Sequence, residues 1–288
     1  MSGPVHLCCA SDKDYILPLS ALIASAYDHC QDLVVHVLDA GIPEEDRTRL
    51  ARLGQVEFTT VYEIEQLRDL QHWPRISTTA YCRLLIPVLL PELSKAIYVD
   101  CDTIINRDLA ALWDIEIGDK AVLAAQEQSC FNYVVRRGLR DYELSGLSPD
   151  TPYFNSGVMV MNLAKWRWDR IAERVFSYTR SHSTVFLDQD GLNALLWQEW
   201  GQLDPRWNVQ IGAWEWAPDT CAEGPFKDVP LREVQTDPWI VHFNGDSKPW
   251  EASNTHPFRS LWQHYHQMVL AAGLPPATCC FEGSSSDN

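Results

Sequence analysis

The sequence predicts an α/β protein in which one mainly parallel sheet is flanked by helices. Its N-terminal half alternates short apolar runs with longer stretches whose apolar residues recur at helical spacing, which is typical of βαβ units. The short runs are continuously apolar, as in strands that are buried on both faces. With 288 residues, 46% of them hydrophobic, the chain can fill one large core.

The first 61 residues contain the clearest alternation of strands and helices. The expected elements are, in chain order, Val5–Cys9, Ile16–His29, Leu33–Leu38, Pro43–Leu53 and Val56–Val61. Proline is tolerated in the first turn of a helix, which allows both predicted helices. Neither G-x-G-x-x-G nor G-x-x-x-x-G-K-[ST] occurs, so the dinucleotide fingerprint and the P-loop are absent.

A predicted helix at Ser77–Leu90 carries a single charged side chain. It begins at a Ser/Thr cap and ends before Pro91. Its only charge is Arg83, which has two interpretations. Either the arginine reaches out to solvent from an apolar surface, or it points into a polar pocket.

The remaining chain continues the mixed pattern. The expected elements are a short helix at Asp108–Trp113, strands at Ala121–Ala125, Tyr153–Asn162 and Trp239–Phe243, and helices at Lys165–Ser181, Leu192–Trp200 and Pro257–Ala272. Residues 128–153 are polar and favour a loop or lid, and residues 204–238 favour an irregular segment rich in Trp and Pro. We expect one domain over residues 1–275 and a disordered Ser-rich tail over residues 276–288.

Composition excludes several functional classes. The net charge of −16 argues against nucleic acid and anionic membranes as partners, because both require clustered Lys and Arg. The N-terminus has no signal-peptide pattern, and no run of 18 apolar residues predicts a transmembrane helix. The nine cysteines are scattered without any C-x-x-C, which disfavours structural zinc and favours a reducing cytoplasm.

Two carboxylates directly follow the buried run that begins at Lys95. Ligands of open α/β sheets bind beyond the carboxyl ends of the strands, where Asp100 and Asp102 are expected. Their i, i+2 spacing lets both converge on one hard cation that also accepts phosphate oxygens. Short acidic turns are also common on surfaces, so the motif alone is weak. The side chain of Cys101 should point to the opposite face and pack there.

Three later stretches place polar groups where an apolar element begins or ends. Asn155, Ser156 and Gly157 lie at the start of a strand, where small residues permit close approach of a ligand or form a bulge. Asp188 precedes the helix expected from Leu192 and is either an N-cap or part of a site. His242 ends a strand and is followed by Gly and Lys, which suits metal ligation with phosphate binding.

Taken together, these stretches resemble glycosyltransferase family 8, the retaining transferases of the GT-A fold. The likeness is strongest to bacterial lipopolysaccharide galactosyl- and glucosyltransferases, and glycogenin is more distant. It covers residues 5–250 in the family's order. The matching stretches are Ala10, Asp12 and Tyr15; His36–Ile42; Thr79–Leu84; Tyr98–Asp102; Phe154–Val158; Asn162–Leu163; Lys165–Trp166; Asp188–Asp190; and His242, Gly245 and Lys248–Trp250.

The resemblance implies a role for each matching position. Asp100, Asp102 and His242 would bind Mn²⁺, with Mg²⁺ as the alternative, and Gly245 and Lys248 would hold the donor phosphates. The donor site would also include Ala10, Asp12, Asp14, Tyr15, Cys101, Arg83, Asn155, Asp188 and Gln189. Of these, Arg83, Asp188 and Gln189 would be catalytic. Arg75 and Glu127 would face the acceptor.

The implied function is transfer of glucose or galactose from a UDP-sugar to an acceptor hydroxyl, with an α linkage. The acceptor, a carbohydrate or glycolipid, is the least specified part. Asp14 replaces a common Asn, Arg75 replaces a His, and the C-terminal region lacks a basic aromatic tail. Two alternatives stay open: a catalytically silent UDP-sugar-binding protein, and a glycogenin-like self-glucosylating protein. For the second, Tyr133 and Tyr142 are candidate targets that nothing in the sequence singles out.

Overall fold

A seven-stranded sheet forms the centre of the computed structural model, which describes residues 3–61, 64, 78–129, 147–215 and 224–273. Its strand order is β3-β2-β1-β4-β7-β6-β8. In chain order the strands are β1 (Val5–Ser11), β2 (Leu33–Asp39), β3 (Val56–Thr60), β4 (Lys95–Val99), β6 (Val122–Gln126), β7 (Phe154–Asn162) and β8 (Trp200–Gln202). All neighbours pair in parallel except β7, which is antiparallel to β4 and β6. This confirms the mainly parallel α/β sheet.

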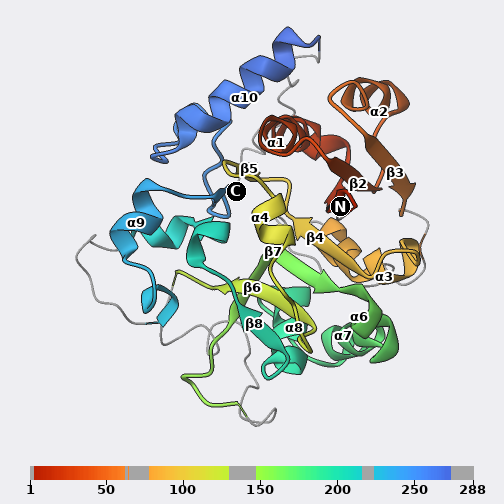
Figure 1. Ribbon diagram of the computed structural model, residues 1–288, viewed down its shortest axis with the longest axis vertical. Coiled ribbons are helices and arrows are strands. Elements are labelled where there is room, and N and C mark those ends of the chain that lie inside the picture. The colour runs from red at the N-terminus through yellow and green to blue at the C-terminus, as the bar shows by residue number, and fades with distance from the viewer. Residues whose placement is uncertain (1–2, 62–63, 65–77, 130–146, 216–223, 274–288) are drawn as a thin grey trace, which may run out of the picture.

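Helices cover both faces of this sheet (Figure 1). The α-helices of the described residues are α1 (Ile16–His29), α2 (Glu44–Leu50), α3 (Ile86–Leu89), α4 (Ala110–Trp113), α6 (Leu163–Trp168), α7 (Ile171–Ser181), α8 (Asp188–Leu196), α9 (Leu231–Thr236) and α10 (Arg259–Ala271). In Figure 1, α1 and α10 lie side by side at the top, while α6, α7 and α8 lie at the bottom.

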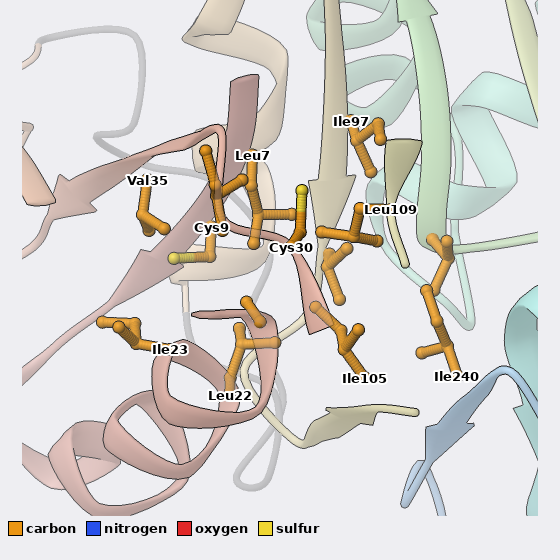
Figure 2. Close-up of a cluster of buried hydrophobic side chains, with 14 of the residues drawn as sticks. Leu7, Cys9, Leu22, Ile23, Cys30, Val35, Ile97, Ile105, Leu109 and Ile240 are labelled. Carbon is orange, nitrogen blue, oxygen red and sulfur yellow. The ribbon is translucent and has the colours of Figure 1, made fainter. Parts of the chain in front are cut away.

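Alternation along the central strands divides the core into two buried clusters. Leu7 and Cys9 of β1 point to one face, where they meet Leu22 and Ile23 of α1. Figure 2 shows this cluster, in which side chains from β1, β2, β4 and α1 converge with Ile105 and Ile240. Cys8 points to the opposite face, where the cluster includes residues of α6, α7 and α8. Burial on both faces explains why the strands are continuously apolar.

A second, three-stranded sheet lies against the end of β4. Its order is β5 (Thr103–Ile105), β10 (Ile240–His242) and β9 (Val209–Gln210). The chain leaves β4 at Val99, passes through residues 100–102 and enters β5 directly. Because His242 pairs with Thr103, the end of β10 lies beside that turn. The junction of the two sheets therefore brings Asp100, Asp102 and His242 together.

Several predicted boundaries hold, but three predicted helices differ in the structure. The first helix occupies Ile16–His29 as predicted. The helix predicted at Ser77–Leu90 is instead a 3₁₀ segment over Thr78–Leu85 followed by the short α3. Pro87 explains the change, because it has no N–H for the carbonyl of Arg83 and its ring would clash there.

The helix predicted at Lys165–Ser181 is two helices. The chain breaks between α6 and α7 at Arg170, which has a left-handed φ of 51°. Trp166 and Ile171 are five residues apart and would point to different sides of one continuous helix. The break lets both pack into the same buried cluster, so tertiary packing overrides the local sequence signal.

The helix predicted at Leu192–Trp200 is also shifted. It begins at Asp188, in the polar stretch, and ends at Leu196, while Trp200 belongs to β8, a strand that the prediction missed. The N-cap position is Leu187, so the interpretation of Asp188 as a cap is wrong.

Some predictions concern residues outside the described part of the chain. These are the acceptor residue Arg75, most of the predicted lid with Tyr133 and Tyr142, and the tail predicted over residues 276–288. Within the described residues, no helix is long and apolar enough to cross a membrane.

Candidate active site

Asp100, Asp102 and His242 form a compact cluster at the junction of the two sheets. One ligand atom from each lies within 4.8 Å of the others. His242 Nε2 is 3.3 Å from Asp102 Oδ1 and 3.8 Å from Asp100 Oδ2. Two carboxylates and one imidazole at this separation are a donor set that fits a divalent cation such as Mn²⁺ or Mg²⁺.

The backbone of Gly157 makes room for this cluster. A Cβ atom at this position would lie 2.2 Å from His242 Cε1 and 2.8 Å from Asp100 Oδ2. Any side chain would therefore displace the imidazole or the carboxylate. This close approach is a second observation that fits the residues to a cation.

Lys248 adds a positive charge beside the cluster. Its Nζ donates to Asp102 Oδ2 and to the carbonyl of Phe243, each at 2.7 Å. Burial alone would raise the pKa of Asp102, but Lys248 and His242 outweigh it and hold that pKa well below its ordinary value. Asp102 is therefore a carboxylate in this structure. Gly245 lies in the same loop, where an added Cβ would make only ordinary contact with Ile211.

Arg83 points into the protein, so the interpretation as a snorkelling surface residue is wrong. It is 5% exposed, and its Nε lies 3.0 Å from Asp188 Oδ2. Its Nη1 lies 3.4 Å from Asp100 Oδ1 and donates to the carbonyl of Ser156 at 2.7 Å. Burial lowers its pKa, but the two carboxylates outweigh burial and raise it. Arg83 thus links Asp100, a candidate cation ligand, to helix α8.

The first turn of α8 presents Asp188 and Gln189 beside Arg83. Burial raises the pKa of Asp188 to about 6, although Arg83 acts in the opposite direction. Gln189 Oε1 accepts from Ser156 through the backbone N–H at 2.8 Å and the hydroxyl at 3.1 Å. Leu187, just before the helix, has a φ of 51°, a strained conformation that is typical of functional turns.

Asp190 stabilises that strained turn. Its Oδ1 accepts from the hydroxyl of Tyr153 at 2.5 Å. Its Oδ2 accepts from the backbone N–H groups of Val185 and Phe186, at 2.6 and 3.0 Å. Asp190 is fully buried, so its contacts assign it to the scaffold of the turn.

Asn155 and Glu127 contact each other directly. Asn155 Nδ2 donates to Glu127 Oε2 at 3.0 Å, and Glu127 Oε1 accepts from the hydroxyl of Ser129 at 2.6 Å. Both side chains are buried. The predicted donor residue and the predicted acceptor residue therefore belong to one hydrogen-bonded unit.

The end of β1 supplies the remaining predicted positions. Asp12 accepts from the backbone N–H of Asp14 at 3.0 Å, and Asp14 is exposed. The ring of Tyr15 lies edge-on to Trp250, with the centroids 6.0 Å apart. Burial, and to a smaller extent the carboxylate of Asp102, raise the pKa of Tyr15.

Cys101 packs in the core, as expected, while joining β1 to the acidic turn. It belongs to the buried cluster of α1 and β1. Its Sγ contacts the carbonyl of Ala10 at 3.1 Å. The backbone at Ala10 is thereby held next to the two carboxylates.

Sequence patterns did not identify Tyr98 or Asn208 as site residues. Tyr98 donates to Asp100 Oδ1 at 2.7 Å and lies under the guanidinium of Arg83. Asn208 contacts His242 Nδ1 at 2.9 Å. The sequence carried one signal for Asn208, because this amide lies between two apolar residues, Trp207 and Val209. Its partners could not be identified from that signal, because they lie far away in the sequence.

Comparisons with known proteins agree on one family. The profile of glycosyl transferase family 8 matches residues 6–254. General stress protein A of Bacillus subtilis is 29% identical over 277 residues, covering 91% of this chain and 92% of that protein. Glycosyltransferase GlyB of Streptococcus pneumoniae is 30% identical over 268 residues, which are 89% of this chain and 60% of GlyB.

The fold comparison gives the same result. A structure of the galactosyltransferase LgtC in complex with donor and acceptor sugar analogues has a TM-score of 0.75 and 25% identity, covering 92% of this chain and 96% of that one. This confirms the GT-A fold that the resemblance implied. The matched region includes the acidic turn after β4, the start of β7, the first turn of α8 and the end of β10. The chain belongs to glycosyl transferase family 8.

Proposed function

We propose that the protein transfers glucose or galactose from a UDP-sugar to a hydroxyl of a carbohydrate or glycolipid acceptor, with retention and an α linkage. The observation that carries this proposal is the cluster of Asp100, Asp102 and His242 with Lys248 beside it. The likeness to a galactosyltransferase solved with donor and acceptor sugar analogues supports it.

The charges around the cluster suit a diphosphate leaving group. The mixed oxygen and nitrogen set favours Mn²⁺, with Mg²⁺ as the alternative. When bound, the cation would supply Lewis-acid stabilisation of the negative charge on the departing UDP. Lys248 adds a positive charge, and the pair Lys248–Asp102 orders its Nζ in advance. This arrangement needs no general acid for the leaving group.

Arg83, Asn155, Asp188 and Gln189 are proposed to surround the donor sugar. Retention through two displacements would require a nucleophile under the anomeric carbon. Asp190 is committed to the turn before α8, and Asp188 is paired with Arg83. Gln189 is an amide and a poor nucleophile. We therefore favour a front-face route, in which the leaving phosphate takes the acceptor proton and Gln189 stabilises the positively charged sugar through its carbonyl dipole.

The donor and cation can be tested without an acceptor. Purified protein is incubated with a panel of UDP-sugars and Mn²⁺, and release of UDP is measured. We expect slow hydrolysis of UDP-glucose or UDP-galactose that EDTA abolishes and Mn²⁺ restores. The Asp102→Asn variant should fold and be inactive. Full turnover in excess EDTA would refute the cation, and binding of UDP-sugar without any turnover would favour the silent binding protein.

The mechanism is tested at Gln189. The Gln189→Ala variant should be slower but measurably active, because the front-face route uses the amide only for electrostatic support. Its product should keep the α configuration, which the coupling of the anomeric proton reports by NMR. A glycosyl ester trapped on Asp188 or Asp190, detected by mass spectrometry with a slow donor, would establish double displacement instead.

The proposed location is the cytoplasm. All five cysteines within the described residues are buried, unpaired thiols. Free thiols are expected where glutathione and thioredoxin keep cysteines reduced.

A further inference from the structure

A row of buried polar side chains leads from Glu127 to the cation cluster. Asn155 Nδ2 lies 3.0 Å from Glu127 Oε2, Asn208 Nδ2 lies 2.9 Å from Asn155 Oδ1, and Asn208 Oδ1 lies 2.9 Å from His242 Nδ1. All four side chains are at most 8% exposed, and Asn208 is fully buried. A buried polar row of this kind has one low-energy arrangement of donors and acceptors.

The direction of every hydrogen bond in this row is determined at its Asn155 end. The backbone N–H of Gly157 can only donate, and it contacts Asn155 Oδ1 at 2.9 Å. The carboxylate of Glu127 accepts, and it faces Asn155 Nδ2. Two independent partners therefore require the same orientation of the Asn155 amide.

That orientation passes through Asn208 to His242. The group of Asn208 that meets Asn155 Oδ1 must donate, so it is the NH₂ group. The carbonyl oxygen of Asn208 is left to face His242 Nδ1, which must carry a proton in order to donate to it. Nε2 is then the ring nitrogen available to a cation, and it is the one that faces Asp100 and Asp102.

We propose that Asn208 is a positioning residue that holds His242 with Nδ1–H donating and Nε2 directed at the divalent cation. This inference rests on the proposed cation site and adds a residue to it. Histidine ligands of metals commonly donate their second N–H to a fixed acceptor, which sets both the tautomer and the angle of the ring. Here the acceptor is a neutral amide whose own orientation comes from the backbone of β7.

The backbone of Asn208 is itself clamped. Gln128 Nε2 donates to the carbonyl of Asn208 at 2.9 Å. Gln128 and Gln210 each donate a backbone N–H to the other's side-chain oxygen, at 3.0 and 2.9 Å. The first of these bonds uses the main-chain carbonyl of Asn208, and the two bonds between Gln128 and Gln210 do not involve its side chain. All three therefore persist when the side chain of Asn208 is truncated. The amide is therefore ordered before a cation binds.

Asn208→Ala tests the proposal, with Asn106→Ala as the matched control. Asn106 is partly buried and its side chain donates to the backbone of Pro238, away from the cluster. The first readout is the tautomer of His242 in the metal-free protein at pH 8, from ¹⁵N NMR of its ring nitrogens. The second is the affinity for Mn²⁺ alone, from the EPR signal of the unbound ion.

We expect Nδ1–H in the wild-type protein and in Asn106→Ala, and a mixture of tautomers in Asn208→Ala. Affinity for Mn²⁺ should fall about 10–100-fold in Asn208→Ala, the usual effect of losing such a partner, and stay unchanged in Asn106→Ala. Asn208→Asp keeps an acceptor for Nδ1–H. Asn208→Asp should therefore retain the Nδ1–H tautomer. Its affinity for Mn²⁺ should be close to that of the wild-type protein and clearly higher than that of Asn208→Ala.

Three results would overturn the proposal. One is an Nε2–H tautomer in the wild-type protein, which needs no variant and so decides the question even if Asn208→Ala does not fold. Another is wild-type affinity for Mn²⁺ in a folded Asn208→Ala protein. The third is an Asn208→Asp protein as weak as Asn208→Ala. By contrast, equal Mn²⁺ binding by wild type and Asp102→Asn would refute the proposed cation site itself.

Discussion

At Gly157 the main chain passes within contact distance of two of the three candidate cation ligands. The absent side chain matters for steric reasons alone, since an added Cβ would overlap His242 Cε1 and approach Asp100 Oδ2. Its N–H also fixes the Asn155 amide. Gly157 thus leaves space for the imidazole of His242, and its N–H begins the row of hydrogen bonds that orients that imidazole.

Gly157→Ala should therefore weaken Mn²⁺ binding. The methyl group must displace His242 or Asp100, which we expect to lower affinity by about tenfold or more. Crowding of a packed interior should also lower the free energy of unfolding by about 1–3 kcal/mol. Calorimetric titration with Mn²⁺ and urea denaturation measure the two effects.

The control for this substitution is Gly3→Ala, because an added Cβ there meets nothing within 4 Å. Both measurements should match wild type in the control. Unchanged Mn²⁺ affinity in Gly157→Ala would show that the imidazole of His242 does not need this space.

At the scale of elements, α8 and the start of β7 behave as one unit. Asn193 on α8 accepts from the N–H of Phe154 at 2.8 Å and donates to its carbonyl at 2.9 Å. One turn earlier, Gln189 accepts from Ser156 on the same strand. Two amides one turn apart therefore hold α8 against β7, which determines where Asp188 and Gln189 lie.

Asn193→Ala should cost both stability and activity. It leaves buried backbone groups of Phe154 without partners, which we expect to lower the free energy of unfolding by about 1–3 kcal/mol. Transferase activity should fall by more than the decrease in the fraction of folded protein explains, because the first turn of α8 would shift relative to β7. The control is Asn162→Ala, which removes the N-cap of α6 and should cost about 1 kcal/mol while leaving activity unchanged. Equal activity in the two variants would contradict this account of α8.

Local sequence determined those elements whose signals agree with one another. Helix α1 was predicted to the residue because its apolar spacing and its boundaries coincide. The break at Arg170 could not be predicted, since neither Gly nor Pro marks it and its cause is the shared cluster of Trp166 and Ile171. The strand β8 was missed because its three residues are extended only through their pairing with the neighbouring strand β6, which local sequence does not indicate.

The candidate site divides in the same way. Asp100, Asp102 and His242 were predicted because strand ends and motif order both point to them. Asn208 was not, because its contacts with Asn155 and His242 join segments that only the folded sheets bring together. A single sequence carries no record of such contacts.

At the scale of the whole molecule, His256 links stability to pH. It is 7% exposed, and its ring lies edge-on to Trp214 and Phe243, with centroids 4.5 and 4.7 Å away. Burial lowers its pKa to about 4. An unfolded chain binds this proton near pH 6.5, so the folded state loses relative stability as the pH falls from there.

The free energy of unfolding should consequently drop by about 1.4 kcal/mol per pH unit between pH 6.5 and 4 through this residue. His256→Asn offers an acceptor for the N–H of Phe258, which now donates to His256 Nδ1 at 3.1 Å, and it does not titrate. Urea denaturation at a series of pH values should show a shallower acid slope for the variant. Parallel curves for the two proteins would exclude His256 as the source.

The junction of the two sheets has a mechanical consequence. Lys248 and Asp102 lie 146 residues apart in the chain, and the bond between them closes that whole length into a loop. A cation bound by Asp100, Asp102 and His242 would close the same loop with stronger bonds, because it would cross-link the end of β4 to the end of β10. Without the cation, the three-stranded sheet should unfold locally before the seven-stranded sheet does, because its strands are only two or three residues long. Divalent cations would then protect β5, β9 and β10 from amide hydrogen exchange and from proteases, independently of any sugar.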